Sequence, residues 1–298
     1  MTNTMTRSLI ETFVHSKLES LKEFPERTTR NLVDMALQFS KGGFQKRFFE
    51  IAQEMLRNEK SAYYHLIYHT ISNVDANRLL TFGMNIGYNS CIHGAKIIRK
   101  LESQSDLNIP WCVTLRLHDD TADHLEHYNK LLQDSKTMGV YTWNIFPQGQ
   151  LPYFFPVMEQ HPDCAFLLFC TADEISERLL ETLEPLHNIM FVIEYQESDT
   201  ELFHIMQKKK QLYSAYLYYK PETINDICNG EIPSGLNATN SIFAFLFPDN
   251  TCSPEDREMI EHYVMEYRNE PLYKTVLFDF LSDTQRINRI ITHKPDCK

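Results

Sequence analysis

The stretch "RLLTFGMNIGYNSCIHGAKIIRKLE", residues 78–102, decides how the fold is interpreted. It begins with an apolar run, passes through a turn rich in glycine and asparagine, and continues in a pattern typical of a helix. Short apolar runs bounded by turn residues are typical of strands that are buried on both faces of a parallel sheet. The stretch therefore predicts a strand followed by a helix, the first unit of an α/β domain.

Seven further apolar runs follow, and helical patterns separate them. They are "WCVTLRL" (111–117), "VYTWNIF" (140–146), "CAFLLFC" (164–170), "IMFVIEY" (189–195), "LYSAYLYY" (212–219), "SIFAFLF" (241–247) and "TVLFDFL" (275–281). Eight strands alternating with helices predict a (β/α)8 TIM-like barrel, and an open or partly closed barrel of six to eight strands is the alternative. Because the start of the chain carries only helical patterns, we expect a helical N-terminal region over 1–76 and the barrel domain over 77–298.

Composition restricts the classes of partner. The chain of 298 residues has a formal net charge of −11, and an acidic surface repels nucleic-acid phosphates and anionic lipid. We therefore expect no nucleic-acid or membrane partner. The first residues do not resemble a signal peptide and the apolar runs are too short to cross a bilayer, so we predict a cytoplasmic protein. The seven cysteines have no paired spacing and are expected to be reduced thiols.

The candidate site residues are polar residues that interrupt the apolar runs. Side chains alternate between the two faces of a strand, and barrel active sites form at the carboxyl ends of the strands. If the more apolar face packs on the helices, the polar side chains of the runs point into the lumen of the barrel, among them Asn85, Arg116, Asn144, Glu194 and Asp279. Lys220, at the end of the sixth run, could reach a carboxylate or a phosphate.

Two interpretations of these residues stay open. In the first, an arginine with two carboxylates and two amides binds a small polar or anionic molecule at the barrel mouth. In the second, Arg116, Glu194 and Asp279 form a buried ion-pair network without any ligand, since buried charges have to be paired. Asn85 and Asn144 would then bond to each other or to water.

Histidine and cysteine patterns give no metal site. His65 and His69 have the i, i+4 spacing of a zinc-protease helix, but Leu66 stands where that motif needs a glutamate. His124 and His127 are expected on a solvated helix face. No nucleophile elbow, phosphate-binding loop or dinucleotide fingerprint occurs, so no known motif identifies a cofactor.

The predicted layout, a strand, a loop with a cysteine and then a helix, resembles the first unit of radical S-adenosylmethionine enzymes. Over residues 78–280 the likeness is one of layout. That family holds a [4Fe–4S] cluster with Cys-x3-Cys-x2-Cys, whereas "GYNSCIHGAKIIR" has only Cys91, and "LRLHDD" (115–120) replaces the expected Gly-Gly-Glu segment. The resemblance implies a degenerate barrel that has lost the cluster, because one thiolate cannot hold it. Cys91 is then expected to be a buried, inert thiol.

Three functional hypotheses follow. The first is a protein that binds a small polar or anionic ligand, or a protein partner, at the barrel mouth without radical chemistry. The alternative is an enzyme in which Glu194 or Asp279 is the acid/base and Arg116 clamps an anionic substrate. The second alternative is a radical S-adenosylmethionine enzyme with a non-standard iron–sulfur site.

Overall fold

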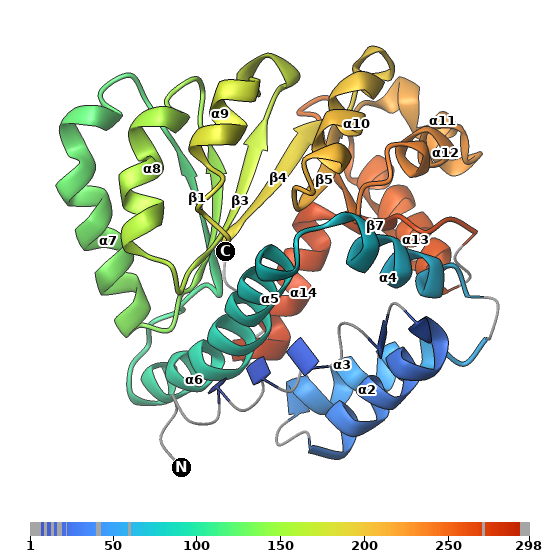
Figure 1. Cartoon of the computed structure of the whole chain (residues 1–298), viewed down its shortest axis with the longest axis horizontal. Coiled ribbons are helices and arrows are strands. Elements are labelled where there is room, and N and C mark those ends of the chain that lie inside the picture. Colours follow the sequence, from blue (N-terminus) through green and yellow to red (C-terminus); the bar gives the residue numbers. More distant parts are fainter. Residues whose placement is uncertain are drawn as a thin grey trace. The chain divides into compact units, whose positions relative to one another are not determined.

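The computed structural model of the chain describes residues 7–8, 11–12, 15–16, 20–21, 23–39, 43–58, 61–269 and 272–292 (Figure 1). The described residues divide into two compact units. The first unit contains residues 75–193 together with the described residues before 17 and after 286. The second contains residues 17–74 and 194–286, so that its helical start and its strands come from opposite parts of the sequence.

Six helical elements with described bounds come before the first strand. They are α2 (Pro25–Phe39), α3 (Gly43–Met55) and α4 (Ala62–Asn73) in the second unit, and α5 (Ala76–Met84), the π-helix η1 (Asn85–Gly94) and α6 (Ala95–Gln104) in the first. Figure 1 draws α5, η1 and α6 as one continuous helix. No helix among the described residues is long and apolar enough to cross a membrane.

The first predicted strand is therefore wrong, because residues 78–86 are helical. Asp75 begins α5: its carboxylate accepts hydrogen bonds from the backbone N–H groups of Asn77 (2.9 Å) and Arg78 (3.1 Å). Seven residues over 78–90 are buried: Arg78, Phe82, Met84, Asn85, Tyr88, Asn89 and Ser90. Four of them, Arg78, Phe82, Asn85 and Asn89, form one row at helical spacing. Because three of these four are polar, the apolar residues of the segment alone do not show the helical period.

The other seven predicted strands are present and form one parallel sheet in the order β1 to β7. They are β1 (Cys112–Arg116), β2 (Thr142–Phe146), β3 (Ala165–Cys170), β4 (Ile189–Glu194), β5 (Tyr213–Tyr219), β6 (Phe243–Pro248) and β7 (Val276–Asp279). This linear order is that of a half-barrel. It fits the alternative prediction of six to eight strands and corrects the closed eight-stranded barrel.

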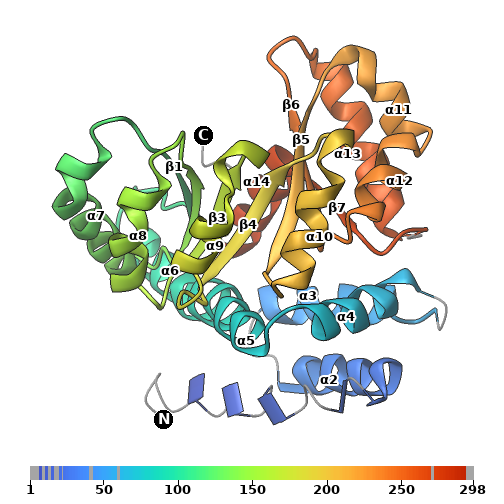
Figure 2. The same cartoon turned by 45° about the horizontal axis from the view of Figure 1, so that its top comes forward.

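Short 3-10 turns and helices connect the strands. They are η2 (Thr121–His124), α7 (Leu125–Thr137), α8 (Leu151–Gln160), η3 (Ala172–Glu174), α9 (Glu177–Thr182), η4 (Glu197–Asp199), α10 (Thr200–Lys208), η5 (Pro221–Thr223), α11 (Ile224–Cys228), α12 (Glu231–Ala238), α13 (Pro254–Asn269) and α14 (Phe280–Thr292). In the second unit, Figure 2 shows α11, α12 and α13 gathered along β5 and β6.

The connecting helices cover one face of the sheet in the first unit. The ring of Phe154 in α8 packs edge-on against Phe166 in β3, with ring centroids 6.5 Å apart. Trp143 of β2 pairs with Phe166 and is fully buried on the same face. The opposite face, which we call the inner face, carries Thr114 and Arg116 of β1 and the residues that pair with them.

Two glycines allow the end of η1 and the turn before β2 to approach closely. A Cβ atom added at Gly94 would lie 2.1 Å from the backbone oxygen of Gly139, and one added at Gly139 would lie 2.5 Å from that of Gly94. Gly139 also has φ +95°, in the left-handed region that favours glycine. By contrast, a Cβ at Gly83 in α5 would meet no atom within 4 Å.

We expect Gly94→Ala to lower the free energy of unfolding by about 1–3 kcal/mol, because the methyl group overlaps a backbone oxygen that cannot rotate away. Gly83→Ala is the matched control and should leave it unchanged or raise it by up to about 1 kcal/mol through helix propensity. Urea denaturation of both variants measures the difference. Equal effects of the two substitutions would contradict the close approach.

Candidate functional site

The candidate site lies at the carboxyl ends of β1 and β2 on the inner face. Arg116, the last residue of β1, is exposed, and its guanidinium carbon lies 5.5 Å from the centroid of the Phe146 ring. Arg116 and Phe146 are partners in the strand register. Phe146 in turn stacks on Phe169 of β3, with centroids 4.7 Å apart and an interplanar angle of 10°. The cation therefore lies on a platform of two aromatic rings.

A polar pair lies one step deeper on the same face. Asn144 is buried and pairs with the exposed Thr114 in the register of β1 and β2. Its amide nitrogen donates to the Thr114 hydroxyl oxygen over 3.3 Å and lies 3.9 Å from the sulfur of Cys112. Since the Thr114 oxygen accepts from Asn144, the hydroxyl proton of Thr114 is available to a further acceptor.

The carboxylates of the neighbouring loops have other partners. Asp119 accepts from the side-chain amide of Gln150 over 3.3 Å, and Asp120 lies 3.2 Å from the ring nitrogen Nε2 of His124. Glu174 accepts from the backbone N–H of Gly149, which fixes the loop after β2. In the described part of the first unit, Arg116 accordingly makes no ion pair and no hydrogen bond.

Asn85 was predicted at the mouth of the barrel, and the structure places it elsewhere. It begins η1, is fully buried, and donates to the backbone oxygens of Pro162 and Cys164, 2.8 Å away in each case. These two residues come before β3, so Asn85 lies at the amino end of that strand. Its amide satisfies buried backbone groups, and a bond to Asn144 does not form.

The remaining predicted residues belong to the second unit by their positions. Glu194 ends β4, and its side chain is half-buried. Lys220 is exposed after β5, and its backbone N–H donates to the hydroxyl of Thr223 over 3.0 Å. Arg116 and Asn144 are thus the two predicted residues that the structure brings together within one unit.

Asp279 ends β7 and is buried. Its strand partner is Leu246, and neighbouring positions on the other face carry Phe245 and Phe278. The Asp279 carboxylate accepts from the backbone N–H of Ser282 over 2.8 Å, which caps the first turn of α14. Burial raises the pKa of Asp279, and the hydrogen bond from Ser282 opposes that shift.

The donor set around Cys91 does not fit an iron–sulfur cluster. Cys91 lies within η1 rather than in a loop after a strand, and burial raises the pKa of its thiol to about 12. Cluster ligands are thiolates, which such a pKa disfavours. The six cysteines that the structure describes are free thiols, and its described residues contain no group of three histidine, cysteine or acidic side chains able to hold a metal ion.

Sequence reasoning missed the aromatic platform under Arg116. Alternation along the third run, "VYTWNIF", puts Phe146 on the same face as Asn144, and that signal was present. The pairing of Arg116 with Phe146 depends on the register between two strands, and the distant sequence positions of the strands do not specify it.

We expect Asn85→Ala to lower the free energy of unfolding by about 1–3 kcal/mol, because the carbonyls of Pro162 and Cys164 lose their donors inside the protein. Asn77→Ala, at an exposed position of α5, is the control and should change it by less than about 0.5 kcal/mol. Thermal and urea unfolding measure both. A neutral Asn85→Ala variant would contradict the structural role given to Asn85.

The thiols of Cys91 and Cys112 should react slowly in the folded protein. Burial raises the pKa of each thiol to about 12, so the thiolate is scarce at pH 8 and becomes more abundant only as the pH rises. Alkylation by iodoacetamide at pH 8, followed by mass spectrometry, should be at least about a hundredfold slower than in urea. Equal rates in both conditions would contradict this burial.

Comparisons with known proteins assign no family to the chain. A scan against protein-family models and a search of curated proteins both found no match. The resemblance to radical S-adenosylmethionine enzymes therefore extends no further than a parallel α/β sheet with the strand order of a half-barrel. What the chain does has to be argued from its own residues.

Proposed function

We propose that this protein binds a small anionic or polar molecule at the carboxyl ends of β1 and β2, with Arg116 as the group that holds the anion. One observation carries the proposal. The Arg116 guanidinium is exposed, lies over the ring of Phe146, and has no carboxylate partner in the described part of the first unit.

The chemistry of the surrounding groups supports an anionic ligand. A guanidinium presents a planar set of donors that matches a carboxylate or a phosphate with two parallel hydrogen bonds. Contact with Phe146 restrains the plane of the guanidinium, which lowers the entropy lost on binding. The Thr114 hydroxyl adds a donor beside it. Ligands of parallel α/β sheets characteristically bind at this edge, beyond the carboxyl ends of the strands.

The proposal is one of binding rather than catalysis. In the enzyme hypothesis, Glu194 or Asp279 is the acid/base, and the carboxylate of Asp279 is already engaged as the cap of α14. The cluster hypothesis needs thiolates that the buried Cys91 does not supply.

The experiment is a titration of the ¹⁵N-labelled full chain with inorganic phosphate and with acetate, observed at the arginine side-chain Nε–Hε signals. We expect the signal of Arg116 to move in a saturable way. Arg116→Gln should weaken the binding seen at the backbone signals of β1 and β2 by about tenfold or more, because a charged hydrogen-bond donor is lost.

Arg178→Gln is the matched control, because Arg178 is an exposed arginine of α9 outside the site. It should bind the same anions as the unaltered chain. If Arg116→Gln and Arg178→Gln bind equally well, or if the Arg116 signal does not respond to any small anion, the proposed function is wrong.

A further inference from the structure

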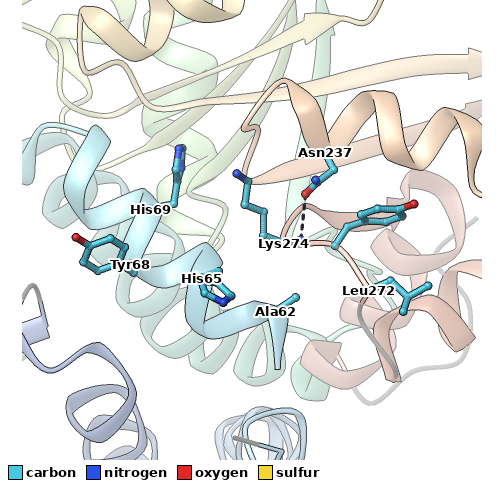
Figure 3. Close-up of a pocket in the computed structure, with 8 residues that line it drawn as sticks. Ala62, His65, Tyr68, His69, Asn237, Leu272 and Lys274 are labelled. Carbon is cyan, nitrogen blue, oxygen red and sulfur yellow. Dashed lines mark hydrogen bonds between the residues drawn. The ribbon is translucent and has the colours of Figure 1, made fainter. Parts of the chain in front are cut away.

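A separate pocket lies in the second unit, between α4 and the residues that lead into β6 and β7. Its volume is about 330 Å³, and it is lined by Ala62, His65, Tyr68, His69, Asn237, Leu272, Tyr273 and Lys274 (Figure 3). Small-molecule sites commonly begin at about this size. The lining residues come from α4, α12 and the segment before β7, and none of them belongs to the site at Arg116.

The lining of the pocket is basic. His65 and His69 lie one turn apart on α4, and Lys274 comes from the segment before β7. Figure 3 shows the side chain of Lys274 extending toward the helix that carries His69. Among the described residues that line the pocket there is no aspartate or glutamate, although the whole chain has a formal net charge of −11.

Neutral amides hold the basic groups in place without neutralising them. The Lys274 ammonium donates to the side-chain oxygen of Asn240, and its backbone N–H donates to Asn237 over 3.1 Å. On the other side, the His69 ring nitrogen Nε2 lies 3.5 Å from the amide nitrogen of Gln207. Gln207 also accepts from Asn240 over 3.5 Å, so the two sides of the pocket are connected.

The electrostatics of these groups indicate a shortage of negative charge. Burial lowers the pKa of Lys274. Burial also lowers the pKa of His69, and the positive charge of Lys274 lowers it further. A bound anion would reverse both shifts, because it favours the protonated form of each group.

We propose that this pocket binds a small organic oxyanion, whose carboxylate or phosphate group contacts Lys274, His65 and His69. Its rim is apolar: the side chains of Tyr68 and Leu272 are 47% and 83% exposed and offer contact area to the organic part of the ligand. The proposal is independent of the function assigned to the Arg116 site, because no residue is shared.

The histidine pair at i, i+4 would otherwise suggest a metal ion. A cation at this place would have to be bound beside the Lys274 ammonium, and like charges in a partly buried site repel each other. The described residues also offer no third histidine, cysteine or acidic ligand there. The arrangement of charges favours an anion over a metal ion.

The test is a titration of the full chain, with its histidines ¹³C-labelled, with inorganic phosphate and with benzoate at constant ionic strength. We expect the Cε1–H signals of His65 and His69 to shift in a saturable way and the pKa of His69 to rise when the anion is bound. Lys274→Met should weaken binding by about tenfold or more, because a charged donor is lost.

His65→Gln provides a second variant whose folding is not at risk, because His65 is exposed. It should weaken binding by a smaller factor. Lys100→Met, at an exposed position of α6, is the control and should bind as the unaltered chain does. The proposal would be overturned if neither Lys274→Met nor His65→Gln weakened anion binding. It would also be overturned if zinc bound at His65 and His69 while phosphate and benzoate did not.

Phosphate without benzoate would identify phosphate esters as the ligand class, and benzoate without phosphate would identify carboxylates. No response of His65 and His69 to either anion would overturn the proposal. Because Arg116→Gln leaves every lining residue of this pocket intact, the two sites succeed or fail independently.

Discussion

One long helix organises the first unit. Its buried polar side chains donate hydrogen bonds to backbone carbonyls at the amino ends of the strands. Arg78 donates to the carbonyls of Glu184 and Leu186 before β4. Further along, Asn85 and Asn89 satisfy the carbonyls before β3, and the last part of the helix packs against the turn before β2 at Gly94. The helix over 76–104 thus meets the amino ends of the strands in reverse order. Each buried carbonyl left without a donor would cost about 1–3 kcal/mol.

This arrangement determines which end of the strands is available for chemistry. The amino ends of β2, β3 and β4 are covered by a helix whose buried Arg78, Asn85 and Ser90 are engaged in hydrogen bonds. At the other end, the connecting loops are held by Glu174 and Gln150, while Arg116 and Thr114 remain exposed. Fixed loops around an unneutralised cation make a preorganised anion site, and the aromatic platform beneath it adds orientation without adding a competing charge.

The sequence predicts this fold well wherever burial is apolar on both faces. The run "CAFLLFC" predicts β3 because every side chain of that strand is buried, and this burial is visible in composition. The prediction fails over 78–86. There the polar residues Arg78 and Asn85 are buried in one helical row with Asn89, and the apolar residues wrongly indicate a strand. Arg116 and Asn144 could be found from alternation. The contact of Arg116 with Phe146 and the position of Lys274 opposite His69 could not be found in this way. They depend on strand register and on packing between distant segments.

The order of these contacts along the chain has a consequence for synthesis on the ribosome. Arg78 emerges long before its partner carbonyl at Leu186, which lies 108 residues later. At about 5–20 residues per second, the helix waits roughly 5–20 s before that bond can form. During this interval the guanidinium of Arg78 and the amides of Asn85 and Asn89 remain hydrated, so the nascent helix presents a polar stripe where an ordinary core helix would present an apolar one. The same side chains that lock the finished unit thus keep its first helix soluble while the rest of the unit is being made.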